Sequence, residues 1–281
     1  MSNNDNTNPV SPAELKKITE ELYKQNLELA TLYKKVGHLN KELATANENL
    51  KELINQRESL MHLINHKVKG AFTHSKYIFA GILDGTFGEA PPEIKKIAQQ
   101  GLESDNAGIN TVDLVLNVAN MQTGTIKYDM KTINLKEIVL KAISEKKDRV
   151  EEKGLKLESA IKDADYLVSG DTFWLKEVMN NLIDNSIKYT KEGVITIDLS
   201  KRDGKVLISV KDTGIGITEE DKKNLFTEGG RGKDSLKINV DSTGYGLYSV
   251  KLIINAHKGK TWGESKGAGQ GSTFFVELPP A

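Results

Sequence analysis

A narrow apolar stripe runs along the N-terminal part of the chain and restricts what this part can fold into. Apolar residues recur with alternating steps of three and four over more than six heptads, the period of a coiled coil. The a positions hold Leu15, Leu22, Leu29, Val36, Leu43 and Leu50, and the d positions hold Ile18, Leu32, Leu39, Ala46, Leu53 and Leu60. Because so narrow a stripe suits a partner seam, we expect a parallel dimeric coiled coil over residues 13–58. One long helix folded on its own domain is the alternative.

Composition narrows the class of protein. The 281 residues suffice for two modest domains, and the absence of cysteine excludes disulfides and thiolate metal sites. The 39 basic and 39 acidic residues cancel, which argues against nucleic-acid binding. No apolar stretch is long enough to cross a bilayer, and the polar start, predicted to be disordered over residues 1–12, lacks a signal-peptide core. We therefore expect a cytoplasmic chain without a transmembrane segment, whose possible upstream sensor or membrane tether lies outside it.

The long helix is predicted to form one arm of a helical hairpin. It should run through Ile82 and stop at the glycine-rich segment 84–88, while Pro91 and Pro92 open a second helix. The apolar stripe of this second helix consists of Ile94, Ala98, Leu102, Ile109, Val112, Leu116 and Ala119. Two hairpins, one from each protomer, would make a dimeric four-helix bundle of residues 59–124.

Residues 125–281 are predicted to form a two-layer α/β sandwich, so that the whole chain is α+β. Strands are expected at 155–160, 166–169, 194–200, 205–211, 260–264 and 272–278, after a short strand and a helix that ends near Lys153. Further helices are expected from Asp171 and from Gly246 to about His257. The third and fourth of these strands alternate and should form a hairpin across Asp203-Gly204.

Three polar motifs follow one another in the sandwich region. On the helix that contains NNLIDNSIKYT, Asn181, Asn185 and Lys188 project from one face. A strand then delivers Asp212 into a turn loosened by Gly214 and Gly216. The third motif, STGYGL at residues 242–247, is a second flexible turn that opens another helix, and GSTFFVELP closes the series at residues 271–279.

This order and spacing resemble the N, G1 and G2 boxes and the closing strand of the GHKL ATPase fold, and more narrowly the catalytic domain of a bacterial sensor histidine kinase. The resemblance implies an ATP site with Mg²⁺, in which Asn185 supplies the metal's oxygen ligand beside Asn181. It also implies that Lys188 and Tyr189 contact the nucleotide and that Asp212 accepts the exocyclic amine of adenine. The remaining implied nucleotide-binding residues are Gly214, Gly216, Thr243, Gly244, Gly246 and Leu247.

Between the two glycine turns lies a polar, glycine-rich segment long enough to be a lid. Phe226 matches the first aromatic of the family's F box, whereas Gly229 stands where a second aromatic is common. Arg231 matches a lid arginine that stabilises charge on the γ-phosphate, although a solvated loop cation is the alternative.

The same resemblance extends to LMHLINHKVKGAF, which has the position and the basic fourth residue of the histidine-kinase H box. His66 lies about 200° round the helix from both Ile64 and Val68, so it should point away from the bundle. It precedes Asn185 by 119 residues, a separation suited to the two-domain layout. His62 and His74 compete with it, but neither is followed by this pattern.

The H box departs from the family pattern at three positions. Lys67 replaces the acidic residue that orients the ring or takes its proton, and a protonated lysine can do neither. Gly70 stands where threonine or asparagine is associated with phosphatase activity, and Ala71 replaces a proline. We therefore expect slow or unusually supported autophosphorylation and weak phosphatase activity.

Three functions remain open at this point. The first is a homodimeric histidine kinase that phosphorylates His66 from ATP and passes the phosphoryl group to an aspartate in a response-regulator receiver domain. The second is an ATP-binding regulator whose His66 no longer accepts phosphate, as Lys67 and Gly70 would favour. The third is a hydrolase of the gyrase, MutL or heat-shock-chaperone type, but these use a glutamate to activate water where this chain has Asn181.

Overall fold

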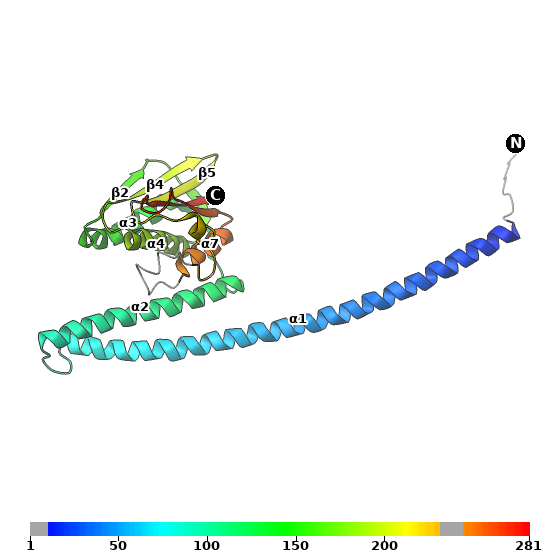
Figure 1. Ribbon diagram of the computed structural model, residues 1–281, viewed down its shortest axis with the longest axis horizontal. Coiled ribbons are helices and arrows are strands. Elements are labelled where there is room, and N and C mark those ends of the chain that lie inside the picture. Colours follow the sequence, from blue (N-terminus) through cyan, green and yellow to red (C-terminus); the bar gives the residue numbers. More distant parts are fainter. Residues whose placement is uncertain (1–10, 231–243) are drawn as a thin grey trace. The chain divides into compact units, whose positions relative to one another are not determined.

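The computed structural model describes residues 11–230 and 244–281, and its contacts divide the chain into two units, Met1–Ile64 and Asn65–Ala281. Helix α1 (Pro12–Leu83) begins in the first unit and continues into the second, as predicted (Figure 1). Ser11 caps it reciprocally, because its Oγ accepts from the Glu14 amide at 3.3 Å and its own amide donates to the Glu14 carboxylate at 2.9 Å. Every residue from 12 to 60 is exposed in the single chain, so the heptad stripe is uncovered. Among the described residues, no helix has an apolar stretch that could span a membrane.

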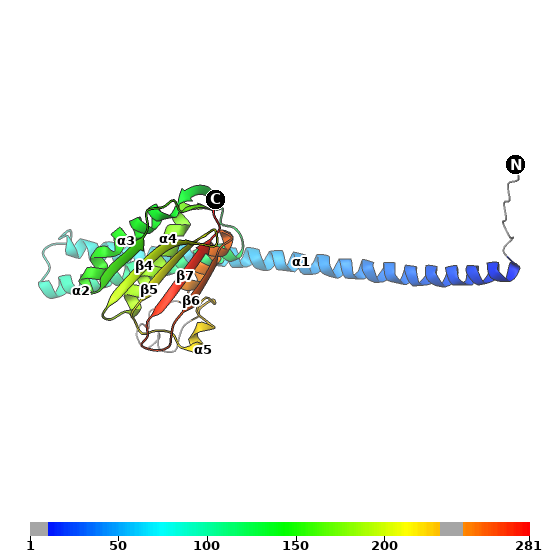
Figure 2. The same cartoon turned by 90° about the horizontal axis from the view of Figure 1, so that it is seen from above.

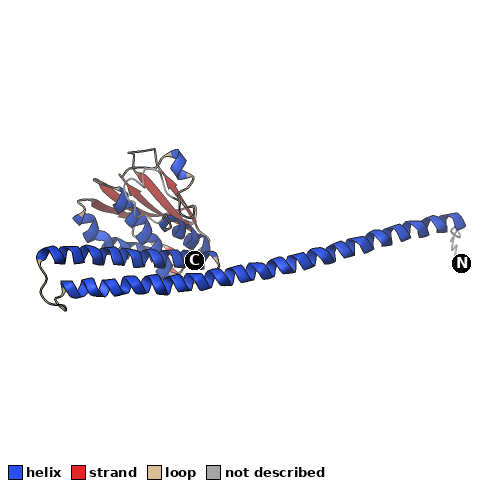
Figure 3. Ribbon diagram, turned by 60° about the horizontal axis from the view of Figure 1, so that its bottom comes forward, coloured by secondary structure: helices blue, strands red, loops and turns tan. Residues whose placement is uncertain are grey.

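The second unit begins with an antiparallel helical hairpin. The C-terminal part of α1 packs against α2 (Pro92–Gln122), which opens with proline in its first turn, and a short loop joins them (Figure 3). The contacts that align the two helices are Lys69 with Asp113, Phe72 with Gly108, Ser75 with Asp105, and Phe79 with Gly101. Rings seated on glycines bring the two helices close together and fix their register.

A five-stranded mixed sheet forms one layer of the sandwich, in the order β2-β4-β5-β7-β6 (Figure 2). Its strands are β2 (Lys156–Ile161), β4 (Val194–Arg202), β5 (Lys205–Asp212), β6 (Lys260–Glu264) and β7 (Ser272–Leu278). Only β2 and β4 pair in parallel; the other neighbours are antiparallel. The predicted turn at Asp203-Gly204 is confirmed, and both residues have positive φ, 51° and 78°, as a two-residue hairpin turn requires.

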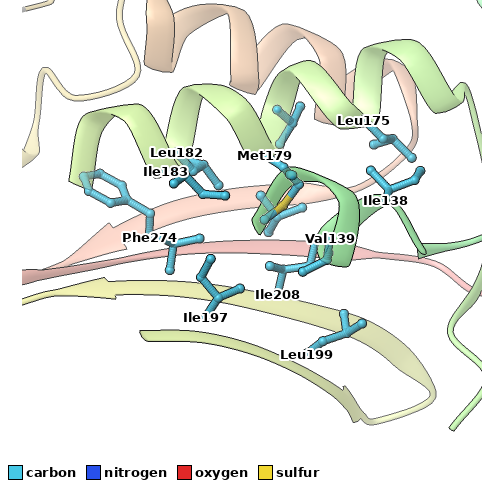
Figure 4. Close-up of a cluster of buried hydrophobic side chains, with 14 of the residues drawn as sticks. Ile138, Val139, Leu175, Met179, Leu182, Ile183, Ile197, Leu199, Ile208 and Phe274 are labelled. Atoms are coloured by element: carbon cyan, nitrogen blue, oxygen red, sulfur yellow. The ribbon is translucent and has the colours of Figure 1, made fainter. Parts of the chain in front are cut away.

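Among the described residues, three helices form the other layer and cover one face of the sheet: α3 (Leu135–Glu152), α4 (Thr172–Tyr189) and α7 (Gly246–Ala256) (Figure 1). Alternate residues of β4 and β5 point into this interface, as the period of two in the sequence predicts. Leu182 and Ile183 of α4 face Ile197 of β4 in the core (Figure 4), and all three are fully buried. Burial of each such side chain contributes about 1.5–3 kcal/mol.

The pairing of two short strands, and one short helix, were not predicted from the sequence. The predicted strands β1 (Lys131–Asn134) and β3 (Leu167–Gly170) pair with each other in a separate two-stranded sheet. A short helix, α5 (Glu219–Lys222), follows β5, and Thr218 caps it by accepting from the Asp221 amide at 3.2 Å. The remaining boundaries agree with the sequence-based expectation to within a few residues.

Candidate functional site

Helix α4 carries the polar face predicted from the sequence. Asp171 caps its first turn by accepting from the amides of Phe173 and Trp174 at 2.9 and 3.2 Å. Leu175, Val178, Met179, Leu182 and Ile183 of α4 are buried against the sheet, whereas Asn181, Asn185 and Lys188 are half-buried. Packing of the apolar side therefore fixes the direction in which the two amides and the ammonium project.

The C-terminal end of α4 is held by α3. The Lys153 ammonium donates to the backbone oxygens of Ile187 and Lys188, and burial lowers the pKa of Lys153. One turn earlier, Asp184 accepts from Lys146 and Arg149, each at 2.8 Å. Lys153 thus satisfies carbonyls that the helix end leaves open, and the ion pairs of Asp184 help to fix the last turn of α4.

Asp212 lies at the end of β5 and is only 3% exposed. Its Oδ2 accepts from the Ser272 hydroxyl at 2.5 Å, and its Oδ1 accepts from the amides of Gly214 and Ser272 at 2.9 and 3.3 Å. Burial raises the pKa of the Asp212 carboxyl, while these hydrogen bonds oppose the rise. The carboxylate is thus oriented and partly desolvated, which strengthens any further hydrogen bond that it accepts.

The turn after Asp212 needs its glycines. Gly216 has φ of +70°, and a Cβ there would lie 2.0 Å from the backbone oxygen of Gly267. A Cβ on Gly214 would lie 2.4 Å from the backbone oxygen of Tyr189, which also accepts from the Ile215 amide at 3.2 Å. The glycines are therefore required for lack of space as well as for flexibility. The backbone of α4 and of residues 265–271 lies so close to this turn that a side chain would not fit.

The start of α7 approaches α4 on another side. A Cβ on Gly246 would lie 3.0 Å from Oδ1 of Asn181, so the absence of a side chain keeps the space beside this amide open. Gly244 has φ of +73° and lies against the backbone of Gly229, which brings together the two described ends of the predicted lid. Leu247 and Phe226 each pack against the hydrophobic core.

The structure therefore gathers most of the predicted residues along one helix. Gly246 contacts Asn181 in the middle of α4, and the turn after Asp212 contacts Tyr189 at its end. Asn185 lies one helical turn from each of these two α4 residues. The Lys188 ammonium lies 5.3 Å from the centroid of the Tyr189 ring.

The structure does not place three predicted residues in this group. Arg231 and Thr243 lie outside the described residues. His66 lies on α1, where its side chain is exposed, in agreement with the outward direction expected from the helical period.

Sequence analysis missed two serines that shape the site. Ser272 holds the Asp212 carboxylate, and Ser265 holds the glycine turn through backbone groups of both segments. The position of Ser272 at the start of the closing strand could be read from the sequence. That it lies opposite Asp212 could be predicted only with knowledge of the strand order in the sheet. Nothing local distinguishes Ser265.

The side chains near this group determine which metal ion it could bind. Among the described residues, no three His, Asp or Glu side chains converge as ligands. A divalent cation in this group would thus depend on an amide oxygen, together with water and oxygens of a bound phosphate, which is the coordination that Mg²⁺ tolerates.

The domain that holds this group of residues is similar to a known family of ATPase domains. Residues 170–281 match the model of the histidine kinase-, DNA gyrase B- and HSP90-like ATPase family. The chain is homologous to sensor histidine kinases and carries this family's ATPase domain.

Two relatives support the homology along the chain. The adaptive-response sensory kinase SasA of Gloeothece citriformis is 28% identical over 260 residues, which cover 90% of this chain and 64% of that protein. The sensor protein GacS of Pseudomonas syringae pv. syringae is 28% identical over 176 residues, which cover 60% of this chain and 19% of that protein. The chain therefore spans less than two thirds of either relative.

Two solved structures share the fold. Full-length ShkA in complex with AMPPNP superposes with a TM-score of 0.65 at 20% identity, covering 79% of this chain and 45% of ShkA. The histidine kinase AdeS of Acinetobacter baumannii gives a TM-score of 0.55 at 23% identity, covering 76% of this chain and 97% of that structure. A helical N-terminal region followed by an α/β sheet domain thus matches the fold of these structures.

Proposed function

We propose that the chain is a protein-histidine kinase that transfers the γ-phosphoryl group of ATP to His66. The observation that carries the proposal is the convergence of Gly246, the polar face of α4 and the turn after Asp212 on one helix. Homology to sensor kinases supports the same activity.

The residues fit a nucleotide with its metal. Asp212 offers an oriented acceptor for the amino group of adenine, which favours ATP over GTP because guanine carries an oxygen at that position. Gly246 leaves space beside Asn181 and lies at the N-terminus of α7, where backbone amides favour phosphate. Asn185 is the proposed ligand for Mg²⁺, which when bound would neutralise phosphate charge, and Lys188 adds a positive charge.

In the proposed reaction an imidazole nitrogen of neutral His66 attacks the γ-phosphorus in line. The bond from phosphorus to the bridging oxygen breaks, ADP leaves with the electron pair, and the imidazole loses its proton to solvent. His66 is exposed on α1, so it is accessible to a nucleotide that the ATPase domain presents. An aspartate in a receiver domain would then take the phosphoryl group from the imidazole.

The partners and domains are part of the proposal. The exposed heptad stripe of residues 13–58 supports a homodimer, since an uncovered apolar seam of this length calls for a second helix. We assign residues 59–124 to dimerisation and histidine phosphotransfer, and residues 125–281 to catalysis.

Labelling with γ-³²P-ATP tests the assignment of the acceptor. Wild-type protein should gain an acid-labile, alkali-stable label, and His66→Ala should lose it entirely because the nucleophile is absent. His62→Ala and His74→Ala are matched controls on the same helix and should keep the label. Persistence of the label in His66→Ala contradicts the assignment, and nucleotide binding without any label in wild type indicates a regulatory ATP-binding protein.

This regulatory alternative rests on Lys67, which is exposed beside His66 where the family carries an acidic residue. If the lysine only slows the reaction, Lys67→Glu should raise the rate of autophosphorylation at least about tenfold, because a carboxylate can orient the imidazole and accept its proton. Initial labelling rates at saturating MgATP measure the effect.

Lys67→Gln is the control for this substitution. It removes the positive charge without adding an acceptor, so an equal gain in both variants would assign the effect to charge alone. Unchanged labelling in Lys67→Glu would show that this position does not limit the rate.

A further inference from the structure

Ser265 occupies an unusual place beside the proposed nucleotide site. It follows β6 and begins the turn of residues 265–271 that leads into β7. Its Oγ accepts from the amides of Ile217 and Gly267 at 3.0 and 3.2 Å, and it lies 2.6 Å from the backbone oxygen of Gly271, to which it donates. One hydroxyl group thus joins three backbone positions in two segments that lie far apart in the sequence.

The two joined segments also contact each other directly. The amides of Gly269 and Gly271 donate to the backbone oxygens of Ile215 and Gly214, at 2.6 and 3.1 Å. Gly216 adds a close approach, because it packs against the backbone of the 265–271 turn without room for a Cβ. The turn at residues 213–217 therefore packs on the 265–271 turn. The Ser265 side chain, at the start of the second turn, bonds to Ile217 at the end of the first turn and to Gly271 at the end of the second.

The position of this turn matters for the purine-reading carboxylate. The Gly214 amide donates to Oδ1 of Asp212, and Ser272, which follows Gly271 directly, donates to both carboxylate oxygens. The two segments that Ser265 joins thus fix the positions of both residues that donate to Asp212. A shift of either segment would turn the carboxylate or remove one of its donors.

We propose that Ser265 is a positioning residue for purine recognition, which holds the two turns so that the Asp212 carboxylate is aimed at the base. This inference rests on the proposed ATP site, and Ser265 is not itself proposed to contact the nucleotide. Loss of the Ser265 hydroxyl should weaken MgATP binding about tenfold. A factor of ten in affinity corresponds to the net free energy of about one or two hydrogen bonds. Binding of MgGTP, which cannot use this acceptor in the same way, should change less, so that selectivity for ATP falls.

The experiment measures MgATP and MgGTP affinity of the full chain by isothermal titration calorimetry in wild type and three variants. Ser265→Ala should lose about tenfold in MgATP affinity. Ser265→Thr keeps the hydroxyl and should stay within about threefold of wild type. Ser209→Ala is the matched control, because Ser209 lies half-buried on the opposite face of the sheet in β5, the strand that ends at Asp212, and it should leave affinity unchanged.

Amide hydrogen exchange separates positioning from a general loss of stability. In Ser265→Ala the amide of Ile217 should exchange faster, while amides in the core strands β4 and β5 stay protected. Equal MgATP affinity in Ser265→Ala and wild type overturns the inference, as does a loss of affinity accompanied by faster exchange throughout the sheet. If wild type and Ser209→Ala both fail to bind MgATP, the proposed function itself has failed, and this inference falls with it.

Discussion

Replacing Asp212 with asparagine should weaken MgATP binding at least about 100-fold and leave the protein at least as stable as wild type at pH 7. The amide keeps the oxygen that accepts from Gly214, and its NH₂ group can donate to the Ser272 hydroxyl, which is able to accept. Toward an adenine amine, however, the same NH₂ group presents a donor where an acceptor is required. Binding is therefore lost while the local hydrogen bonds survive in altered form.

The stability of this variant should depend on pH in a defined direction. Burial raises the pKa of Asp212 in the folded state above its unfolded value of about 3.9. The protonated form is therefore favoured by folding, and this contribution is fully present below about pH 3.9 and lost as the pH rises through the folded pKa. Asparagine has no charge to bury, so its advantage over aspartate should be absent in acid and should grow until the carboxyl is fully ionised.

Thermal melting between pH 3.5 and 8, together with calorimetric titration of MgATP, tests both effects. Asp198→Asn is the control, because Asp198 lies on β4 with its side chain on the face of the sheet away from the helices, where it is half-buried. It should leave nucleotide affinity unchanged. Asp212→Asn with wild-type affinity would show that this carboxylate does not read the base.

Local patterns were enough to predict most of the elements of this fold. Alternation of Ile195, Ile197 and Leu199 with polar residues predicts the strand that β4 forms, and these three residues are buried. The Asp203-Gly204 turn follows from the preference of these residues for positive φ. These predictions succeed because a strand with one buried face has apolar and polar residues in alternation, which is visible in the sequence.

The contacts that complete the site depend on tertiary structure. Ser272 reaches Asp212 because β7 pairs with β5, and Ser265 reaches Ile217 across 48 residues. Their partners are largely backbone groups or a distant carboxylate, so no spacing between side chains signals them. The pairing of β1 with β3 was missed for a related reason, since two four-residue strands carry too little pattern to specify a partner.

The glycines of the turn after Asp212 provide a second large expected effect. Gly216→Ala should destabilise the ATPase domain by about 3 kcal/mol, because an L-residue at φ of +70° is strained and its Cβ would collide with the Gly267 backbone oxygen. For a domain of this size the melting temperature should fall by about 6–12 °C. The displaced turn should also weaken MgATP binding at least about tenfold, because Gly214 in the same turn orients Asp212.

Gly204→Ala separates the two causes of this effect. Gly204 has a similar φ of +78°, but no atom lies within 4 Å of the position that a Cβ would take. It should therefore show the backbone strain alone, about 1 kcal/mol or 2–4 °C, with MgATP affinity unchanged. Differential scanning calorimetry of both variants, with titrations well below their melting temperatures, measures the difference. Equal destabilisation in the two variants would mean that the turn yields to the added methyl group, and that close packing against residues 265–271 does not hold the Asp212 carboxylate in place.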